Sequence, residues 1–172
     1  DATLVLEWAG GGDLKQHLVA MRKRSLSCVR FDEYTVWKLM VQMCKAMKHM
    51  HDRRVLHRDF KPANILFDDK GRVKIADFGL GRAFSENTVV AHSKVGTPYY
   101  MCPEVIQGKE YDHKCDIWSL GCVFYELAKL HSPFKIIEKK KGSDLYALIT
   151  KITTLQYPKL PCWYSTKLSA LA

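Results

Sequence analysis

The stretch His57-Arg58-Asp59-Phe60-Lys61-Pro62-Ala63-Asn64 is followed, thirteen residues after its last member, by Asp77-Phe78-Gly79. Between the two, residues 65–67 and 72–78 are short β segments, and the turn residues 68–71 predict that these segments form a hairpin. Taken singly, Asp59 and Asn64 are typical of turns, and Lys61 is typical of a solvent-exposed lysine. Isolated turn and surface residues would not explain why the spacing within residues 57–64, the thirteen-residue spacing from Asn64 to Asp77 and the intervening hairpin occur together. These side chains are therefore candidate functional residues.

The composition is that of an ordinary globular protein. The 172 residues carry a net charge of +9, with 47% hydrophobic and 26% charged residues. These values exclude disordered, collagen-like and fibrous classes. A chain of this length can bury a sizeable core, and no stretch reaches the roughly 18 apolar residues that a membrane-spanning helix requires. The sequence predicts one domain, or a large part of one, with no membrane partner.

The positive charge is spread evenly along the chain. Residues 1–90 carry 16 basic and 11 acidic side chains, and residues 91–172 carry 11 and 7. A nucleic-acid-binding tail would concentrate the basic residues in one segment. The distribution therefore predicts no nucleic-acid partner.

Cysteine and histidine spacing provides no standard metal-binding motif. The six cysteines include no C-x-x-C pair, and His49 and His51 are two residues apart, so they do not share a helix face. We interpret both histidines as surface or loop residues. Free cysteines without a disulfide framework favour a reducing, intracellular compartment.

Apolar periodicity predicts a largely helical chain. Asp13 is suited to cap a helix that begins near residue 14, and Asp32 a longer helix that extends to about residue 50. Residues 115–130 are apolar in every direction, which predicts a central helix buried all round. Short strands are expected at residues 4–8 and 55–57, and an amphipathic helix at residues 145–152.

The segments at residues 57–64 and 77–79 resemble the catalytic and magnesium-binding loops of the protein kinases. The resemblance implies that Asp59 accepts or orients the proton of the substrate hydroxyl and that Lys61 contacts the γ-phosphate of ATP. Asn64 and Asp77 would hold Mg²⁺, a hard ion that prefers carboxylate and amide oxygens. The implied activity is transfer of the ATP γ-phosphate to serine or threonine hydroxyls of protein substrates.

Two further segments resemble structural parts of a kinase. Residues 96–104 are similar to the end of an activation loop, with Cys102 in the place of the usual alanine. Residues 116–121 are similar to the start of the buried central helix, and the resemblance implies that Asp116 braces the catalytic loop from behind. Together with the loops, these segments extend the resemblance over nearly the whole chain.

The beginning of the chain resembles the hinge that contacts the nucleotide. The resemblance implies that Leu6 is the gatekeeper, and that Glu7 and Ala9 offer backbone groups to adenine. Asp13 would reach the ribose, and Leu66 would form the floor of the adenine site. These residues extend the implied ATP site beyond the catalytic loop.

Several features place the resemblance among serine/threonine kinases, and more narrowly among the NIMA-related kinases. Lys61 follows Asp59 by two residues, and a Gly-Thr-Pro sequence begins at residue 96, as in serine/threonine kinases. The segments similar to NIMA-related kinases are residues 35–38, 49–55, 80–82, 92–101 and 157–161. That family implies a cytoplasmic location, with nuclear, centrosomal or microtubule-associated locations as alternatives. The glycine run at residues 10–12 has no counterpart in it.

The resemblance also implies regulation by phosphorylation. Ser93 lies four residues before Thr97, at the position where kinases of this type carry an activating phosphate. Arg58 and Arg82 occupy the positions whose cations receive that phosphate. An activating kinase or a scaffold is therefore an implied partner, beside ATP and the protein substrate.

The implied fold is α+β: a protein-kinase-like fold whose mainly α-helical C-terminal lobe carries short β-hairpins. Residues 1–172 would form a partial kinase domain, with hinge strand, catalytic loop, activation loop and central helix but without the N-terminal lobe and the last helices. The sequence contains no G-x-G-x-x-G loop, and Glu104 has no later arginine to pair with, because Arg82 is the last one.

We therefore expect this chain to be marginally stable and inactive by itself. The alternative interpretation is a non-catalytic truncated or pseudokinase-like chain that acts as a scaffold or binding module. The presence of Asp59, Asn64 and Asp77 together favours the enzyme, since a scaffold has no physical need for all three.

Overall fold

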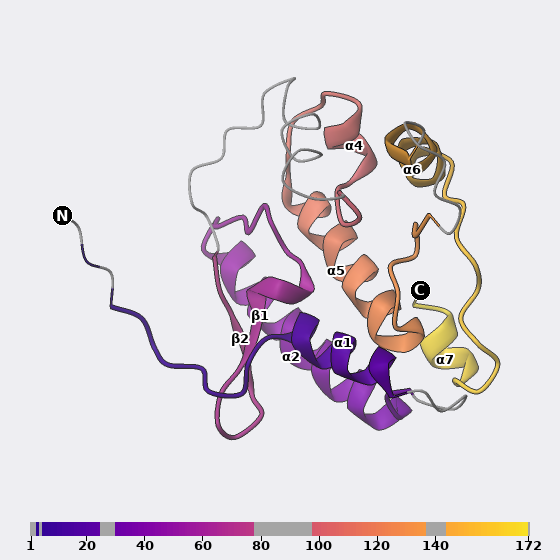
Figure 1. Cartoon of the computed structure of the whole chain (residues 1–172). Helices are drawn as coiled ribbons and strands as arrows, with labels where there is room; N and C mark the ends of the chain where they lie inside the picture. The colour runs from indigo at the N-terminus through magenta and orange to yellow at the C-terminus, as the bar shows by residue number, and fades with distance from the viewer. Residues whose placement is uncertain (1–2, 4, 25–29, 78–97, 137–143, 172) are drawn as a thin grey trace.

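The computed structural model describes residues 3, 5–24, 30–77, 98–136 and 144–171 (Figure 1). Helices and one small antiparallel sheet make up these segments. In chain order the elements are α1 (Leu14–Lys23), α2 (Glu33–Asp52), the 3-10 turn η1 (Pro62–Asn64), β1 (Ile65–Phe67), β2 (Val73–Ile75), α4 (Pro103–Ile106), α5 (His113–Lys129), α6 (Asp144–Thr153) and α7 (Thr166–Ser169). None of the described helices combines the length and apolar content needed to cross a lipid bilayer.

Helix α5 runs through the middle of the molecule, and the hairpin and helices α6 and α7 lie to either side of it in Figure 1. Val123, Phe124 and Leu127 of this helix have no exposed surface, and Ile117 is its exposed large apolar residue. This arrangement confirms the predicted central helix, although the exposure of Ile117 shows that its first turns are not buried on every side. The main core also receives buried side chains from α1, α2, β1 and α7, namely Leu14, Leu18, Val36, Met43, Met47, Ile65 and Leu168.

Two aspartates determine where the first two helices begin. The Asp13 side chain accepts a hydrogen bond from the backbone N–H of Gln16 at 2.8 Å, and Asp32 does the same for Thr35 at 2.9 Å. Each bond satisfies an N–H group that has no partner inside its helix. Both predicted caps are confirmed, and the amphipathic helix expected at residues 145–152 is confirmed as α6.

The hairpin pairs Ile65 with Ile75 and Phe67 with Val73 in antiparallel register. Gly71 has a φ of 69°, a left-handed value that glycine adopts without a steric penalty, and it lies in the turn. The predicted hairpin is therefore confirmed, although its second strand is shorter than expected. A second hairpin is absent from the part of the chain that the structure describes.

Two strands expected from the sequence do not form. The backbone N–H of Val55 donates to the carbonyl of Met50, and that of His57 donates to the carboxylate of Asp116, so neither joins a strand ladder. Residues 5–9 are extended chain rather than a buried strand, and they run away from the helices in Figure 1. A strand needs a neighbouring strand for its backbone groups, and none of the described strands pairs with residues 5–8.

The glycine run at residues 10–12 lets the chain pass closely over β1. The N–H of Gly11 donates to the carbonyl of Phe67 at 2.8 Å, and the N–H of Phe67 donates to the carbonyl of Gly12 at 2.9 Å. A Cβ atom on Gly11 would lie 2.8 Å from the Cβ of Phe67, inside the van der Waals limit. Gly11 is thus required by close backbone approach, and the run has a structural explanation that the sequence did not provide.

A buried carboxylate joins three distant segments. Glu126 of α5 accepts a hydrogen bond from the hydroxyl of Tyr100 at 2.5 Å and forms an ion pair with Arg22 of α1. Arg22 also donates to the carbonyl of Leu130, at the end of α5. Since Glu126 is buried, these partners compensate for the cost of removing its charge from water.

Candidate active site

Asp59 and Lys61 form an ion pair in the loop that precedes η1. The ammonium of Lys61 lies 2.7 Å from a carboxylate oxygen of Asp59, and their side chains are 37% and 31% exposed. Both groups are therefore within reach of a molecule that approaches from solvent. The carboxylate can accept a proton, and the ammonium beside it can neutralise a negative charge on the same approaching molecule.

Asn64 is bonded to the same carboxylate oxygen of Asp59 as Lys61. Its amide nitrogen donates to the backbone carbonyl of Asp59 at 2.9 Å and to the Asp59 side chain at 3.3 Å. These bonds use the amide N–H groups, so the orientation of the amide is fixed and its oxygen is the atom left to act as a ligand. The structure thus brings together Asp59, Lys61 and Asn64, as the sequence predicted.

The hairpin brings Asp77 to the same end of the sheet. Asn64 immediately precedes β1, and Ala76 immediately follows β2. The N–H of Ala76 donates to the carbonyl of Asn64 at 2.9 Å, which extends the antiparallel pairing by one residue. Asp77 is the next residue, has an exposed side chain and a left-handed φ of 59°. The thirteen-residue spacing between Asn64 and Asp77 is therefore the length of the hairpin that connects them.

Asp116 holds the loop from inside the molecule. This fully buried carboxylate, in the first turn of α5, accepts hydrogen bonds from the backbone N–H groups of His57 at 2.9 Å and Arg58 at 3.0 Å. Arg58 has a left-handed φ of 68°, which is uncommon for a residue with a side chain. The bonds from Asp116 stabilise this unusual backbone and hence the position of Asp59.

Two partners of Asp116 were missed by the sequence analysis. His51, at the end of α2, lies 2.8 Å from Asp116 through its Nε2 atom, and the hydroxyl of Tyr111 donates to Asp116 at 2.5 Å. The interpretation of His51 as a surface or loop residue is therefore wrong, because its ring is partly buried inside a helix-to-helix contact. Burial and the Asp116 charge raise the pKa of Tyr111, so this hydroxyl stays protonated as a donor.

His57 is buried at the start of the loop that carries Asp59. Its Nδ1 atom accepts a hydrogen bond from the N–H of Asp59 at 3.3 Å, and its ring contacts Phe60 edge to face. Burial lowers the pKa of His57, and the nearby carboxylates of Asp116 and Asp59 oppose that shift without cancelling it. The ring is therefore neutral near pH 7 and can accept the bond that orients Asp59.

Three of the five residues assigned to nucleotide contacts, Glu7, Asp13 and Leu66, lie along the hairpin. Asp13 and Leu66 form an isolated antiparallel bridge, so these two candidates are neighbours. Glu7 forms an ion pair with Lys74 at 2.8 Å, and Lys74 is the register partner of Leu66. Leu6 is 75% exposed and Ala9 is partly buried.

A pocket of about 620 Å³ is lined by residues of α1, of α2 and of the hairpin and its turn. It does not include Asp59, Lys61 or Asn64. The lining residues are Gly10, Gly11, Leu14, His17, Phe31, Tyr34, Thr35, Lys38, Leu39, Phe67, Asp68, Asp69 and Gly71. The pocket is therefore separate from the candidate active site.

Three regulatory residues predicted from the sequence, Ser93, Thr97 and Arg82, lie outside the described residues. The fourth, Arg58, is described and has an exposed side chain on the strained loop. Glu104 differs from expectation, because its side chain is exposed rather than set for a buried ion pair. Exposure removes the cost that an unpaired buried carboxylate would carry.

Comparison with known proteins agrees with this geometry. The profile of the family described as "Protein kinase domain" matches residues 1–171. The chain is 41% identical over 168 residues to the mouse "Serine/threonine-protein kinase Nek3", which covers 98% of this chain and 31% of that protein. It is 39% identical over 173 residues to the human "Serine/threonine-protein kinase Nek2", which covers 98% of this chain and 37% of that protein.

A third relative is more distant in organism. The "Probable serine/threonine-protein kinase nek2" of Dictyostelium discoideum is 37% identical over 169 residues, covering 96% of this chain and 38% of that protein. The predicted resemblance to NIMA-related kinases is confirmed by these Nek relatives. In each of the three cases the chain spans less than two-fifths of the relative's length.

Proposed function

Because this chain belongs to the protein kinase family, we propose that it acts in transferring the γ-phosphate of ATP to serine and threonine hydroxyls of proteins, as a kinase of the NIMA-related type. The observation that supports this proposal best is the cluster of Asp59, Lys61 and Asn64, joined by contacts of 2.7, 2.9 and 3.3 Å. Family membership also implies ATP and a protein substrate as partners.

Asp59 and Lys61 carry the chemical step. The substrate hydroxyl oxygen forms a bond to the γ-phosphorus, the bond between that phosphorus and the β,γ-bridging oxygen breaks, and ADP leaves. The Asp59 carboxylate accepts or orients the hydroxyl proton. The Lys61 ammonium, 2.7 Å away from that carboxylate, neutralises charge on the transferred group.

The residues present also fit Mg²⁺, the metal that protein kinases generally use. The donor set is an amide oxygen from Asn64 and a carboxylate from Asp77, both hard oxygen ligands. The amide orientation of Asn64 is fixed by its bonds to Asp59, and the exposed Asp77 follows Ala76, whose N–H donates to the carbonyl of Asn64. Mg²⁺ bound by these residues would neutralise phosphate charge on the nucleotide.

The nucleotide itself is assigned to the residues along the hairpin. Asp13 would reach the ribose and Leu66 would lie under the adenine, and their bridge makes them neighbours as such a site requires. Glu7 and Ala9 would supply backbone groups to adenine, and Leu6 would be the gatekeeper. The exposure of Leu6 is compatible with an additional element packing over it.

A non-catalytic scaffold is the other candidate function. A scaffold would not need the paired charges of Asp59 and Lys61 held on a strained loop by a buried aspartate. A cytoplasmic location, with nuclear or centrosomal and microtubule-associated alternatives, stays a prediction.

The test compares the full-length protein with its Asp59→Asn variant. Phosphorylation of a serine- and threonine-containing protein by labelled ATP should fall by about 10²-fold or more in the variant, because the proton acceptor is lost. Asp69→Asn, which changes an exposed aspartate in the hairpin turn, is the matched control and should keep the parent rate. Equal rates in the parent and Asp59→Asn would contradict the proposed role. An inactive full-length parent that contains all kinase elements would favour the scaffold.

A further inference from the structure

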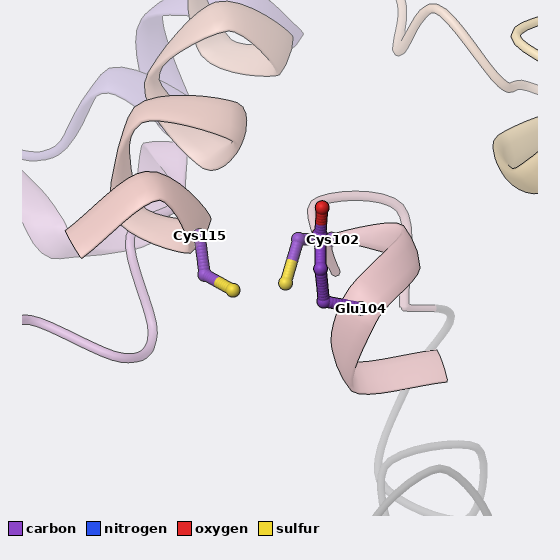
Figure 2. A group of neighbouring side chains, drawn as sticks. All are labelled: Cys102, Glu104 and Cys115. Atoms are coloured by element: carbon purple, nitrogen blue, oxygen red, sulfur yellow. The ribbon is translucent and has the colours of Figure 1, made fainter. Parts of the chain in front are cut away.

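Two cysteines and a glutamate converge between α4 and α5. One ligating atom from each of Cys102, Glu104 and Cys115 lies within 4.8 Å of the others. Figure 2 shows the two sulfur atoms pointing toward one another across the space between the two helices, with the Glu104 side chain beside Cys102. Both cysteines are 1% exposed, whereas Glu104 is exposed.

We propose that Cys102, Cys115 and Glu104 form a binding site for a thiophilic divalent cation of the Zn²⁺ type, which would link the segment before α4 to the first turn of α5. Tetrahedral zinc with Zn–S bonds of about 2.3 Å places two sulfur ligands roughly 3.8 Å apart. The 4.8 Å limit on the three ligand atoms allows that geometry with small side-chain movements. A set of three protein ligands leaves the fourth position to water.

The surroundings of the two sulfurs favour such a site. Cys115 lies in the first turn of the seventeen-residue helix α5, and Cys102 immediately precedes α4, so the two sulfurs are held by the starts of two helices. The apolar side chains of Met101, Val105, Tyr111 and Trp118 pack around the cysteines. Low polarity strengthens the attraction between a cation and thiolate ligands. Glu104 is the exposed member of the group.

Glu104 has a position that a simple thiol contact does not explain. None of the ion pairs among the described residues includes Glu104. A disulfide between Cys102 and Cys115 would use neither its charge nor its carboxylate oxygens. Convergence of all three donors therefore favours a cation over a covalent sulfur–sulfur bond.

Metal binding would have a defined proton balance. Burial raises the pKa of both thiols, most strongly for Cys102, so both are protonated near pH 7 before the metal binds. Forming two thiolate–metal bonds releases both protons to solvent, while the Glu104 carboxylate binds without releasing one. Affinity should therefore fall as the pH is lowered.

The test uses Co²⁺ as a spectroscopic probe in the reduced, chelator-treated chain. One equivalent should produce the visible bands of tetrahedral cobalt and a thiolate charge-transfer band in the near ultraviolet, and Zn²⁺ should displace it. Cys102→Ser and Cys115→Ser should each remove the charge-transfer contribution of one sulfur and lower the affinity at least about tenfold. Cys44→Ser and Cys162→Ser change exposed cysteines and should leave the spectrum unchanged.

Glu104→Gln tests the third ligand without altering the buried cysteines. This variant should keep the charge-transfer band and bind Co²⁺ at least about tenfold more weakly. Circular dichroism of each variant shows that the fold is retained, and a pH indicator should record two protons released per Zn²⁺ bound by the parent. Absence of the charge-transfer band in the parent, or equal affinity in all five variants, overturns the proposal. So does a Cys102–Cys115 disulfide found by mass spectrometry in the unreduced protein, with no affinity for metal after reduction.

Discussion

Asp116 accepts a hydrogen bond from the backbone N–H of His57 at 2.9 Å, across 59 positions of the sequence. The same carboxylate receives the N–H of Arg58 through its other oxygen. Both oxygens are therefore required as acceptors in a fully buried position. The catalytic loop thus depends on the first turn of α5 for its shape.

Asp116→Asn should destabilise the chain by about 2–4 kcal/mol, because one acceptor oxygen becomes an N–H₂ group that faces another donor. Urea unfolding followed by circular dichroism measures this change. Asp52→Asn, which removes an exposed charge that pairs with Lys48 on the surface, should leave the urea midpoint where it is. Equal midpoints for Asp116→Asn and the parent would show that the loop does not depend on this carboxylate.

Gly11→Ala should destabilise the chain by on the order of 1–3 kcal/mol, since the new Cβ would lie 2.8 Å from the Cβ and 2.9 Å from the carbonyl oxygen of Phe67. The backbone atom cannot rotate away. Gly121→Ala is the matched control, because its new Cβ would meet no atom within 4 Å beyond its own chain neighbours and the backbone of its own helix, and in helix α5 alanine should stabilise by up to about 1 kcal/mol. Unfolding experiments on both variants should therefore give changes of opposite sign.

Stability should decrease as the pH is lowered from about 7 through the range in which His57 titrates. Burial lowers the pKa of His57 in the folded chain, so the unfolded chain binds the proton at a higher pH. Between the lowered value and the ordinary value near 6.5, unfolding takes up a proton, and this costs the folded state at most about 1.4 kcal/mol per pH unit.

The His57→Phe variant isolates this contribution. Unfolding free energies measured between pH 8 and pH 5 should show a shallower slope in the variant than in the parent, whatever the absolute stability of the variant. His49→Gln removes an exposed histidine from the end of α2 and controls for the loss of an imidazole. Parallel slopes for the parent and His57→Phe would mean that another group causes the pH dependence.

Ser93→Ala should lower kinase activity in the full-length protein, because the phosphate expected at this position would be lost together with its ordering effect on the loop. Arg58, exposed beside Asp59, is one of the cations expected to receive that phosphate. Kinase assays before and after phosphatase treatment measure the effect. The parent should lose activity on treatment, whereas Ser93→Ala should change little. Unchanged activity in untreated Ser93→Ala would rule out this switch.

Local signals in the sequence predicted local structure correctly. The caps at Asp13 and Asp32 depend on hydrogen bonds that span three residues, and the hairpin turn depends on one glycine with a left-handed φ. The cluster of Asp59, Lys61 and Asn64 was predictable for a similar reason, because these residues are close in sequence. The central helix followed from apolar residues on all its sides.

Features that depend on distant partners were not predictable in the same way. The strand expected at residues 55–57 is absent because its N–H groups are bonded elsewhere, one of them to the carboxylate of Asp116. The contact between His51 and that carboxylate joins residues 65 positions apart. Cys102 and Cys115 are thirteen residues apart, a spacing without a metal signature, and only the packing of α4 against α5 brings them together.

The contact of Arg22 with Glu126 and Leu130 has a consequence for the order in which the molecule assembles. Its two hydrogen bonds close loops of 104 and 108 residues, so α1 cannot reach its final partners until α5 has left the ribosome. Until then, the nascent chain lacks the central helix, so Arg22 and the apolar face of α1 cannot make their contacts with it. Contacts this far apart in sequence form slowly, since a long loop must be ordered before any bond compensates for it. Synthesis of α5 is therefore the earliest step at which the first helix and the loop held by Asp116 can both acquire their long-range contacts.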